Sequence, residues 1–77
     1  MRVRYDEEAD ALYIRLREGQ YEESDEIREG FILDYDADGR IIGIEILEAS
    51  TQLAPMDLGT VNFEINRQLA KPGSRDR

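Results

Sequence analysis

Four carboxylate residues and a glycine near the middle of the chain have the spacing of an EF-hand calcium loop. Asp34, Asp36, Asp38, Gly39 and Glu45 spell D-x-D-x-D-G-x₅-E. In such a loop, oxygen atoms from alternate positions and a final bidentate glutamate surround Ca²⁺, and a helix on each side holds the loop in place. The chemistry that this spacing could support is therefore calcium binding, provided that the flanking segments are helical.

The flanking segments have the composition of β-strands instead. The segment 30–33 starts with Gly30 and continues with poor helix formers, and 40–47 contains four isoleucines and a glycine. We therefore predict a β-hairpin whose turn is 36–39, where Asp and Gly suit a tight turn. In a hairpin Glu45 lies about 10 Å along the strand from the tip. What remains possible is a weak, adventitious divalent-cation site at Asp34, Asp36 and Asp38.

The period-two pattern of this hairpin predicts one apolar and one mixed face. The apolar face would contain Phe31, Leu33, Tyr35, Ile42, Ile44 and Ile46, with Leu33 and Ile44 buried together. The other face would contain Asp34, Asp36 and Glu45, together with three apolar residues around Gly43. A glycine inside a strand indicates close packing at that point. The candidate interface residues on this second face are Ile32, Ile41 and Leu47.

The pattern of the rest of the chain also predicts mainly β-strands. Val3 and Tyr5 begin a first strand, a turn follows at 6–9, and 11–17 alternates as a second strand that sets Val3 opposite Leu12. The turns at Tyr5-Asp6 and Tyr35-Asp36 look like repeats, in which each aspartate bonds turn amides. The segment 22–29 is strongly charged and predicts an edge strand protected against unwanted pairing.

The C-terminal part is less regular. The connection 49–57 has room for one helical turn. In 58–69 the alternation of Val61, Phe63 and Ile65 favours a strand, whereas a stripe of Leu58, Val61, Ile65 and Leu69 would fit a helix. The predicted fold is thus mainly β: a small antiparallel sheet of two hairpins plus an acidic edge strand, with a C-terminal strand or short helix. We expect one domain, residues 1–69, and a disordered basic tail, residues 70–77.

Composition narrows the chemistry further. The chain has no cysteine and no histidine, which excludes disulfides, thiolate and imidazole catalysis and zinc-finger spacing. Residues 1–66 carry 17 acids and 6 bases, so binding to nucleic acid is not expected and a basic protein partner is favoured. The chain has no apolar run of membrane-spanning length and no signal-peptide pattern. We expect a cytoplasmic protein without a cofactor.

Three blocks of the sequence resemble the bacterial family called domain of unknown function 2283. They are Tyr5 to Ile14, Gly30 to Asp36 and Gly39 to Leu47, and the resemblance covers roughly residues 2–50. It implies a small β-rich bacterial domain and brings no established activity or catalytic residues. It also makes an antitoxin-like role imaginable.

Two function classes remain open. One is a non-enzymatic protein-binding module that engages a basic partner. The other is a self-assembling structural domain, for which a homodimer is expected because two-fold dimers are the commonest oligomers. No catalytic residue is predicted, because the serines lack a histidine base and the acidic body lacks a cationic path for a nucleic-acid substrate.

Overall fold

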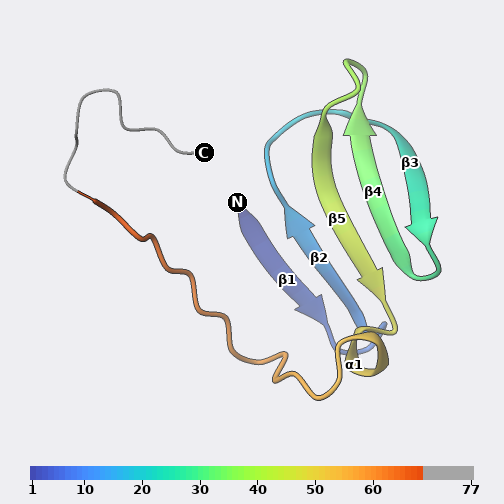
Figure 1. Cartoon of the computed structure of the whole chain (residues 1–77). Helices are drawn as coiled ribbons and strands as arrows, with labels where there is room; N and C mark the ends of the chain where they lie inside the picture. The colour runs from blue at the N-terminus through green and yellow to red at the C-terminus, as the bar shows by residue number, and fades with distance from the viewer. Residues whose placement is uncertain (69–77) are drawn as a thin grey trace.

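The computed structural model describes residues 1–68. Its strands form one open antiparallel sheet (Figure 1). Its strands are β1 (Arg2–Asp6), β2 (Ala11–Arg15), β3 (Tyr21–Arg28), β4 (Phe31–Asp36) and β5 (Ile41–Leu47). Their spatial order is β1-β2-β5-β4-β3, so the acidic strand β3 lies at one edge, as predicted. The single helical turn α1 (Ala49–Gln52) follows at one end of the sheet. The predicted fold class is therefore confirmed; the predicted basic tail, 70–77, lies outside the described residues.

Aspartates organise both predicted hairpin turns. The Asp6 carboxylate accepts hydrogen bonds from two backbone N–H groups of its turn, at 3.0 and 3.2 Å. The Asp36 carboxylate does the same in the second turn, at 2.9 Å for both bonds. Gly39 adopts a φ of +81°, which glycine accepts without steric cost. The EF-hand spacing therefore belongs to a hairpin turn between β4 and β5, as predicted.

The first hairpin has a different register from the predicted one. Val3 pairs with Ile14, and Leu12 pairs with Tyr5. The turn is shifted by one residue because Asp10 adopts a φ of 52°, so the turn covers 7–10 and not 6–9. The resulting shift of two positions keeps the same side chains on the same face of the sheet.

A β-bulge changes the register near the tip of the second hairpin. Tyr35 pairs with Ile41, and Ile42 is left between the paired positions. Ile42 is fully buried, and a Cβ atom placed on Gly19, in the connection between β2 and β3, would lie 3.1 Å from its Cγ2 atom. Tyr35 therefore lies opposite Ile41, and the bulge adds a residue that strict alternation does not include.

Two continuous apolar rows cross four strands of the sheet. One row is Val3–Ile14–Ile44–Leu33, and the other is Tyr5–Leu12–Ile46–Phe31. We call these eight residues the apolar face. Leu33 and Ile44 pair directly, as predicted, but both are only half-buried. Of the eight, only Ile46 is buried, because no second layer of described residues covers the sheet (Figure 1).

The chain leaves the sheet after α1. Residues 58–68 form neither the strand nor the helix considered for 58–69, and residue 69 lies outside the described range. In Figure 1 this segment runs away from the β1 side of the sheet. Val61, Phe63 and Ile65 are 64%, 70% and 57% exposed. We call residues 60–66 the C-terminal arm.

Candidate functional site

The apolar face is left mostly uncovered by the described residues. Its two rows end at β3, where Asp25 pairs with Leu33 and Arg28 pairs with Phe31. The face is therefore an apolar surface with a charged rim along one side. Contiguous exposed apolar surface with a polar rim is characteristic of protein interaction sites. None of its eight residues is charged, so contact through this face buries no ion.

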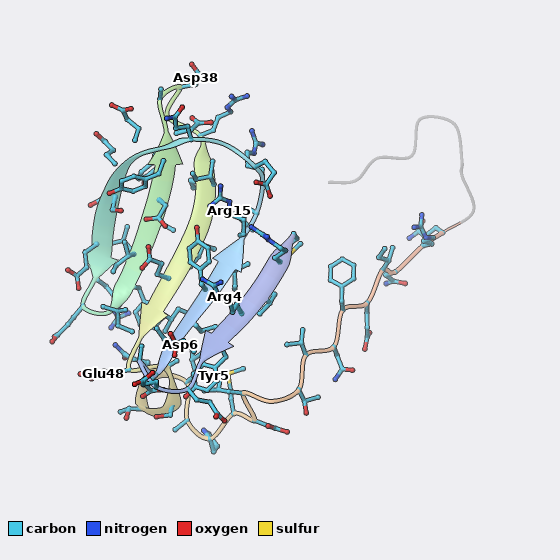
Figure 2. The ribbon with its side chains drawn as sticks, turned by 180° about the vertical axis from the view of Figure 1, so that it is seen from behind. Arg4, Tyr5, Asp6, Arg15, Asp38 and Glu48 are labelled. Atoms are coloured by element: carbon cyan, nitrogen blue, oxygen red, sulfur yellow. The ribbon has the colours of Figure 1, made fainter. Side chains whose placement is uncertain are left out.

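The opposite side of the sheet, which we call the polar face, carries two rows of mostly polar residues. They are Arg2–Arg15–Gly43–Asp34–Ser24 and Arg4–Tyr13–Glu45–Ile32–Glu26. The arginines lie on β1 and β2, and the acids lie on β5, β4 and β3. Figure 2, seen from behind, labels Arg4 and Arg15 on the β1–β2 side. The two halves of this face therefore carry opposite charge.

Gly43 leaves space for an aromatic ring at the centre of the polar face. A Cβ atom at Gly43 would lie 2.6 Å from the Tyr13 hydroxyl oxygen, so any side chain there would displace the ring. Close packing at this glycine was predicted, and the group that packs there is Tyr13. The Arg15 guanidinium donates from Nη1 to the Tyr13 oxygen at 3.3 Å and from Nη2 to the Gly19 carbonyl at 2.9 Å. Arg15 thereby fixes the connection between β2 and β3.

A carboxyl pair lies beside Gly43. Asp34 is only 4% exposed, and its Oδ1 atom accepts a hydrogen bond from the Ser24 hydroxyl at 2.7 Å. Burial raises the pKa of Glu45 to about 7, and a hydrogen bond with Asp34 and the charge of Asp34 add to this effect. Glu45 therefore holds its proton more tightly than an ordinary glutamate does.

An acid next to a base could in principle support general acid–base catalysis. These two carboxyls, however, are joined by a hydrogen bond, whereas the carboxyl pairs of glycosidases stand about 5 Å or more apart to admit a sugar. The nearby hollow is lined by Arg4, Asp6, Ala11, Tyr13 and Glu45. The geometry fits a proton shared inside the sheet better than a pair of groups that flank a substrate.

Asp10 joins the first hairpin turn to α1. Its Oδ1 atom accepts hydrogen bonds from the Tyr5 hydroxyl at 2.6 Å and from the Ser50 backbone N–H at 2.9 Å, and its Oδ2 atom accepts the Ser50 hydroxyl at 2.8 Å. The bond from Tyr5 is the main cause that lowers the pKa of Asp10, and the same bond raises the pKa of Tyr5 to about 12. Asp10 was not among the predicted site residues. The one local sign of its position in the sequence is the residue type, because aspartate tolerates a positive φ.

The three aspartates of the EF-hand pattern have separate partners. Asp34 bonds Ser24 and Glu45, Asp36 accepts turn amides and the Arg40 Nε–H at 3.1 Å, and Asp38 pairs with Arg40 Nη2 at 3.0 Å. Across residues 1–68, no group of three histidine, cysteine or acidic side chains is arranged to hold a metal ion. The Asp36 carboxylate would have to release the turn amides before it could bind a cation.

Calorimetric titration with Ca²⁺ is expected to detect no binding tighter than about 10⁻⁴ M, the weak end of EF-hand affinities. The reason is that Arg40 already neutralises Asp36 and Asp38, while Glu45 is committed to Asp34. The control is Arg40→Gln, which frees both aspartates and should be the variant with the tighter residual binding. A micromolar site in the parent chain that disappears in Glu45→Gln would contradict the hairpin assignment of these residues.

The three predicted interface residues do not form one patch. Ile32 pairs with Glu45, and Leu47 pairs with Ala11. Ile32 and Leu47 therefore lie on the polar side of the sheet. Ile41, which is 39% exposed, pairs with Tyr35, in line with the residues of the apolar face on β4. The bulge at Ile42 separates Ile41 from the other two.

Comparison with known proteins identifies the sheet as a family domain. The searches of curated proteins and of solved structures gave no significant match. No helix in residues 1–68 has the length and apolar character needed to cross a membrane. A family model described as protein of unknown function (DUF2283) matches residues 2–50, which contain the whole sheet and the start of α1. Because this match covers more than half of the chain, the protein belongs to the DUF2283 family.

Proposed function

We propose that this chain is a non-enzymatic protein-binding module whose first partner is a second copy of itself, docked through the apolar face. The observation that carries the proposal is the pair of apolar rows, of which only Ile46 is buried. A sheet with one hydrophobic face is stable when that face packs against another layer. The described residues supply no such layer, and a second sheet about 10 Å away is the simplest one.

The distribution of charge supports the same face. The chain carries a net charge of −8, so two copies repel each other over most of their surfaces. The apolar face holds none of this charge, because the acids lie on β3, in the turns and on the polar face. Association through the apolar face therefore keeps most of the acids in water, where salt screens their repulsion.

A second candidate partner is a basic protein bound along β3, as an antitoxin-like role would require. This edge strand is exposed along its whole length and presents four acids, Glu22, Glu23, Asp25 and Glu26. Such a complex would weaken as salt rises, because its attraction is electrostatic. The self-association proposed above would persist or strengthen with salt. Light scattering on a size-exclusion column at low and high salt therefore separates the two modes, and a pull-down from the source cell would identify a basic partner.

The composition of the chain and its carboxyl pair also support a location and a type of partner. A chain without cysteine needs no oxidising compartment, which supports a bacterial cytoplasmic location. The acidic surface disfavours nucleic acid as a partner. The joined carboxyl pair supports a non-enzymatic role, because it offers no gap for a substrate between its two groups.

Replacing Ile44 by lysine should convert the dimer to a monomer in sedimentation equilibrium. Ile44 lies in the middle of one apolar row, on the central strand β5. A lysine there would place a charge in the interface and weaken the association of the two copies by roughly several kcal/mol. The same lysine lowers the net negative charge of the chain and so weakens the electrostatic repulsion between copies. Dissociation would then be a local effect of the face and not of overall charge.

The matched control is Leu47→Lys, on the same strand but on the polar face, where Leu47 is 39% exposed. This variant should remain a dimer with the strand signal of the parent in circular dichroism, whereas Ile44→Lys should lose the dimer and, because folding is coupled to association, part of its strand signal at low concentration. A parent chain that sediments as a monomer at high concentration would refute the proposal. So would a dimer that survives Ile44→Lys and is lost in Leu47→Lys.

A further inference from the structure

The C-terminal arm has the pattern of a strand but no strand beside it. Residues 60–66 alternate apolar and polar side chains, and Val61, Phe63 and Ile65 are all more than half exposed. The arm starts from a turn in which the Asp57 carboxylate accepts hydrogen bonds from Gly59 N–H and Thr60 Oγ1–H, each at 2.8 Å. From there it runs away from its own sheet (Figure 1).

The sheet has two free edges, and they differ in how well they could accept another strand. Edge strand β3 presents four acids and has two irregularities in its pairing with β4, features that protect an edge against addition. Edge strand β1 pairs regularly with β2 over five residues and carries Arg2 and Arg4 on its polar face. The β1 edge is therefore the one that is open to a further strand.

The arm and β1 are complementary in both face and charge. In an antiparallel pairing with Val61 opposite Tyr5 and Phe63 opposite Val3, the arm extends both apolar rows by one strand. Glu64 then lies opposite Arg2, and a shift of two residues places it opposite Arg4 without changing the faces. Opposite charges in directly facing positions stabilise strand pairs. On β3 the same glutamate would meet acids.

The apolar face alone is smaller than the area that a stable dimer interface buries, so the arm could supply additional contact. Four strands at about 4.8 Å spacing and about six residues at 3.3 Å give a face of roughly 400 Å², below the roughly 800 Å² per partner that a stable interface buries. Phe63 alone can add about 150–250 Å².

We propose that the arm of each copy crosses to the second copy and adds as a strand to its β1 edge. This inference rests on the proposed dimer. Each arm starts beside β1, next to a hollow lined by Arg4, Tyr5, Asp6, Glu7, Leu58 and Gly59. Under a two-fold axis such an exchange is reciprocal, so that both β1 edges are covered and the assembly closes. The exchange gives each copy a sixth strand that is made of the other chain.

Because the chain lacks cysteine, engineered cysteines can test this exchange directly. One chain carries Glu64→Cys, and the other carries either Arg2→Cys or Arg4→Cys to cover the two registers. Directly opposed positions in antiparallel strands have the separation that a disulfide needs. Equal amounts are mixed as full-length chains, oxidised mildly and analysed without reductant. We expect a mixed covalent dimer at twice the chain mass of 8.9 kDa, identified by mass spectrometry.

The matched control pairs Glu64→Cys with Glu22→Cys on β3, and its mixed dimer should form at least about tenfold less. A single chain that carries both Arg4→Cys and Glu64→Cys should form the same covalent dimer. If it instead closes within one monomer while the mixed chains stay separate, the arm pairs with its own β1 and the exchange is refuted. Sedimentation of the parent separates the two proposals: a dimer without any cross-link refutes only the exchange, and a monomer without any cross-link refutes both.

Discussion

Leu33→Ala is expected to lower the free energy of unfolding by about 2–5 kcal/mol, as for other large-to-small changes in a filled core. In the single sheet Leu33 is only half-buried, opposite Ile44. With a second copy on the apolar face the same side chain lies in the middle of an interface. A small domain has a total stability of as little as about 5 kcal/mol, so the variant should be largely unfolded at low concentration.

The measurement is chemical unfolding followed by circular dichroism at two concentrations that differ about hundredfold. Because folding is coupled to association, the unfolding midpoint should rise with concentration. Leu47→Ala is the control: it removes the same side chain from an exposed position of the polar face and should cost less than about 1 kcal/mol. A small loss in Leu33→Ala, with a midpoint that does not depend on concentration, would show that the apolar face is uncovered in solution.

Glu45→Gln is expected to stabilise the protein at pH 8 and to remove most of the pH dependence of its stability between pH 5 and 8. The pKa of Glu45 is raised from 4.5 to about 7 in the folded chain, first by burial and then by Asp34. The folded state therefore binds the proton more tightly than the unfolded state. This contribution to stability is complete below about pH 4.5 and is lost as pH rises through about 7.

The full shift would correspond to about 3 kcal/mol, and screening by solvent at this partly open site reduces it to about 1–2 kcal/mol. Unfolding by urea at several pH values measures the slope. The absence of histidine keeps imidazole titration out of the same window. Glu8→Gln, which makes the same change in the exposed β1–β2 turn, should retain the slope of the parent. An unchanged slope in Glu45→Gln would mean that the carboxyl pair does not form.

The opposite dependence is expected at low pH. Hydrogen bonds from the Tyr5 hydroxyl and from Ser50 lower the pKa of Asp10 below the ordinary value of 3.8. Hydrogen bonds from turn groups lower the pKa of Asp36 and of Asp57 in the same direction. Their contribution to stability is present above that value and is lost as pH falls through the lowered pKa. Together with Glu45, these groups place the maximum of stability near pH 4–5.

The strands and turns could be predicted because local chemistry determines them. Alternating apolar residues gave the hairpins, and Asp36 with Gly39 gave the turn that separates this chain from an EF-hand. The register could not be predicted at two points, because the positive φ of Asp10 accompanies a turn shifted by one residue and the bulge at Ile42 inserts an unpaired residue. Each involves a backbone conformation that several residue types can adopt.

The candidate surfaces were predicted in part. The residues of the apolar face on β4 and β5, which are Phe31, Leu33, Ile44 and Ile46, were identified by their period. The interface was predicted at Ile32, Ile41 and Leu47 on the expectation that the chain's own core fills the apolar face, and the described residues leave most of that face uncovered. The bond between Asp34 and Glu45 joins two neighbouring strands diagonally, because Asp34 pairs with Gly43 and Glu45 pairs with Ile32. Such a diagonal contact can be predicted only when the register of the two strands is known.

The strand order also determines when the sheet can be completed during synthesis. The central strand β5 is the last of the five in the chain, and it joins the hairpin β1–β2 to β3 and β4. Until residue 47 leaves the ribosome, β2 has only β1 beside it, and an isolated two-stranded hairpin is marginal in water. The pairing of Leu12 with Ile46 joins distant parts of the chain, and such contacts slow folding. The sheet is therefore completed from its two edges inward, with its middle strand added last.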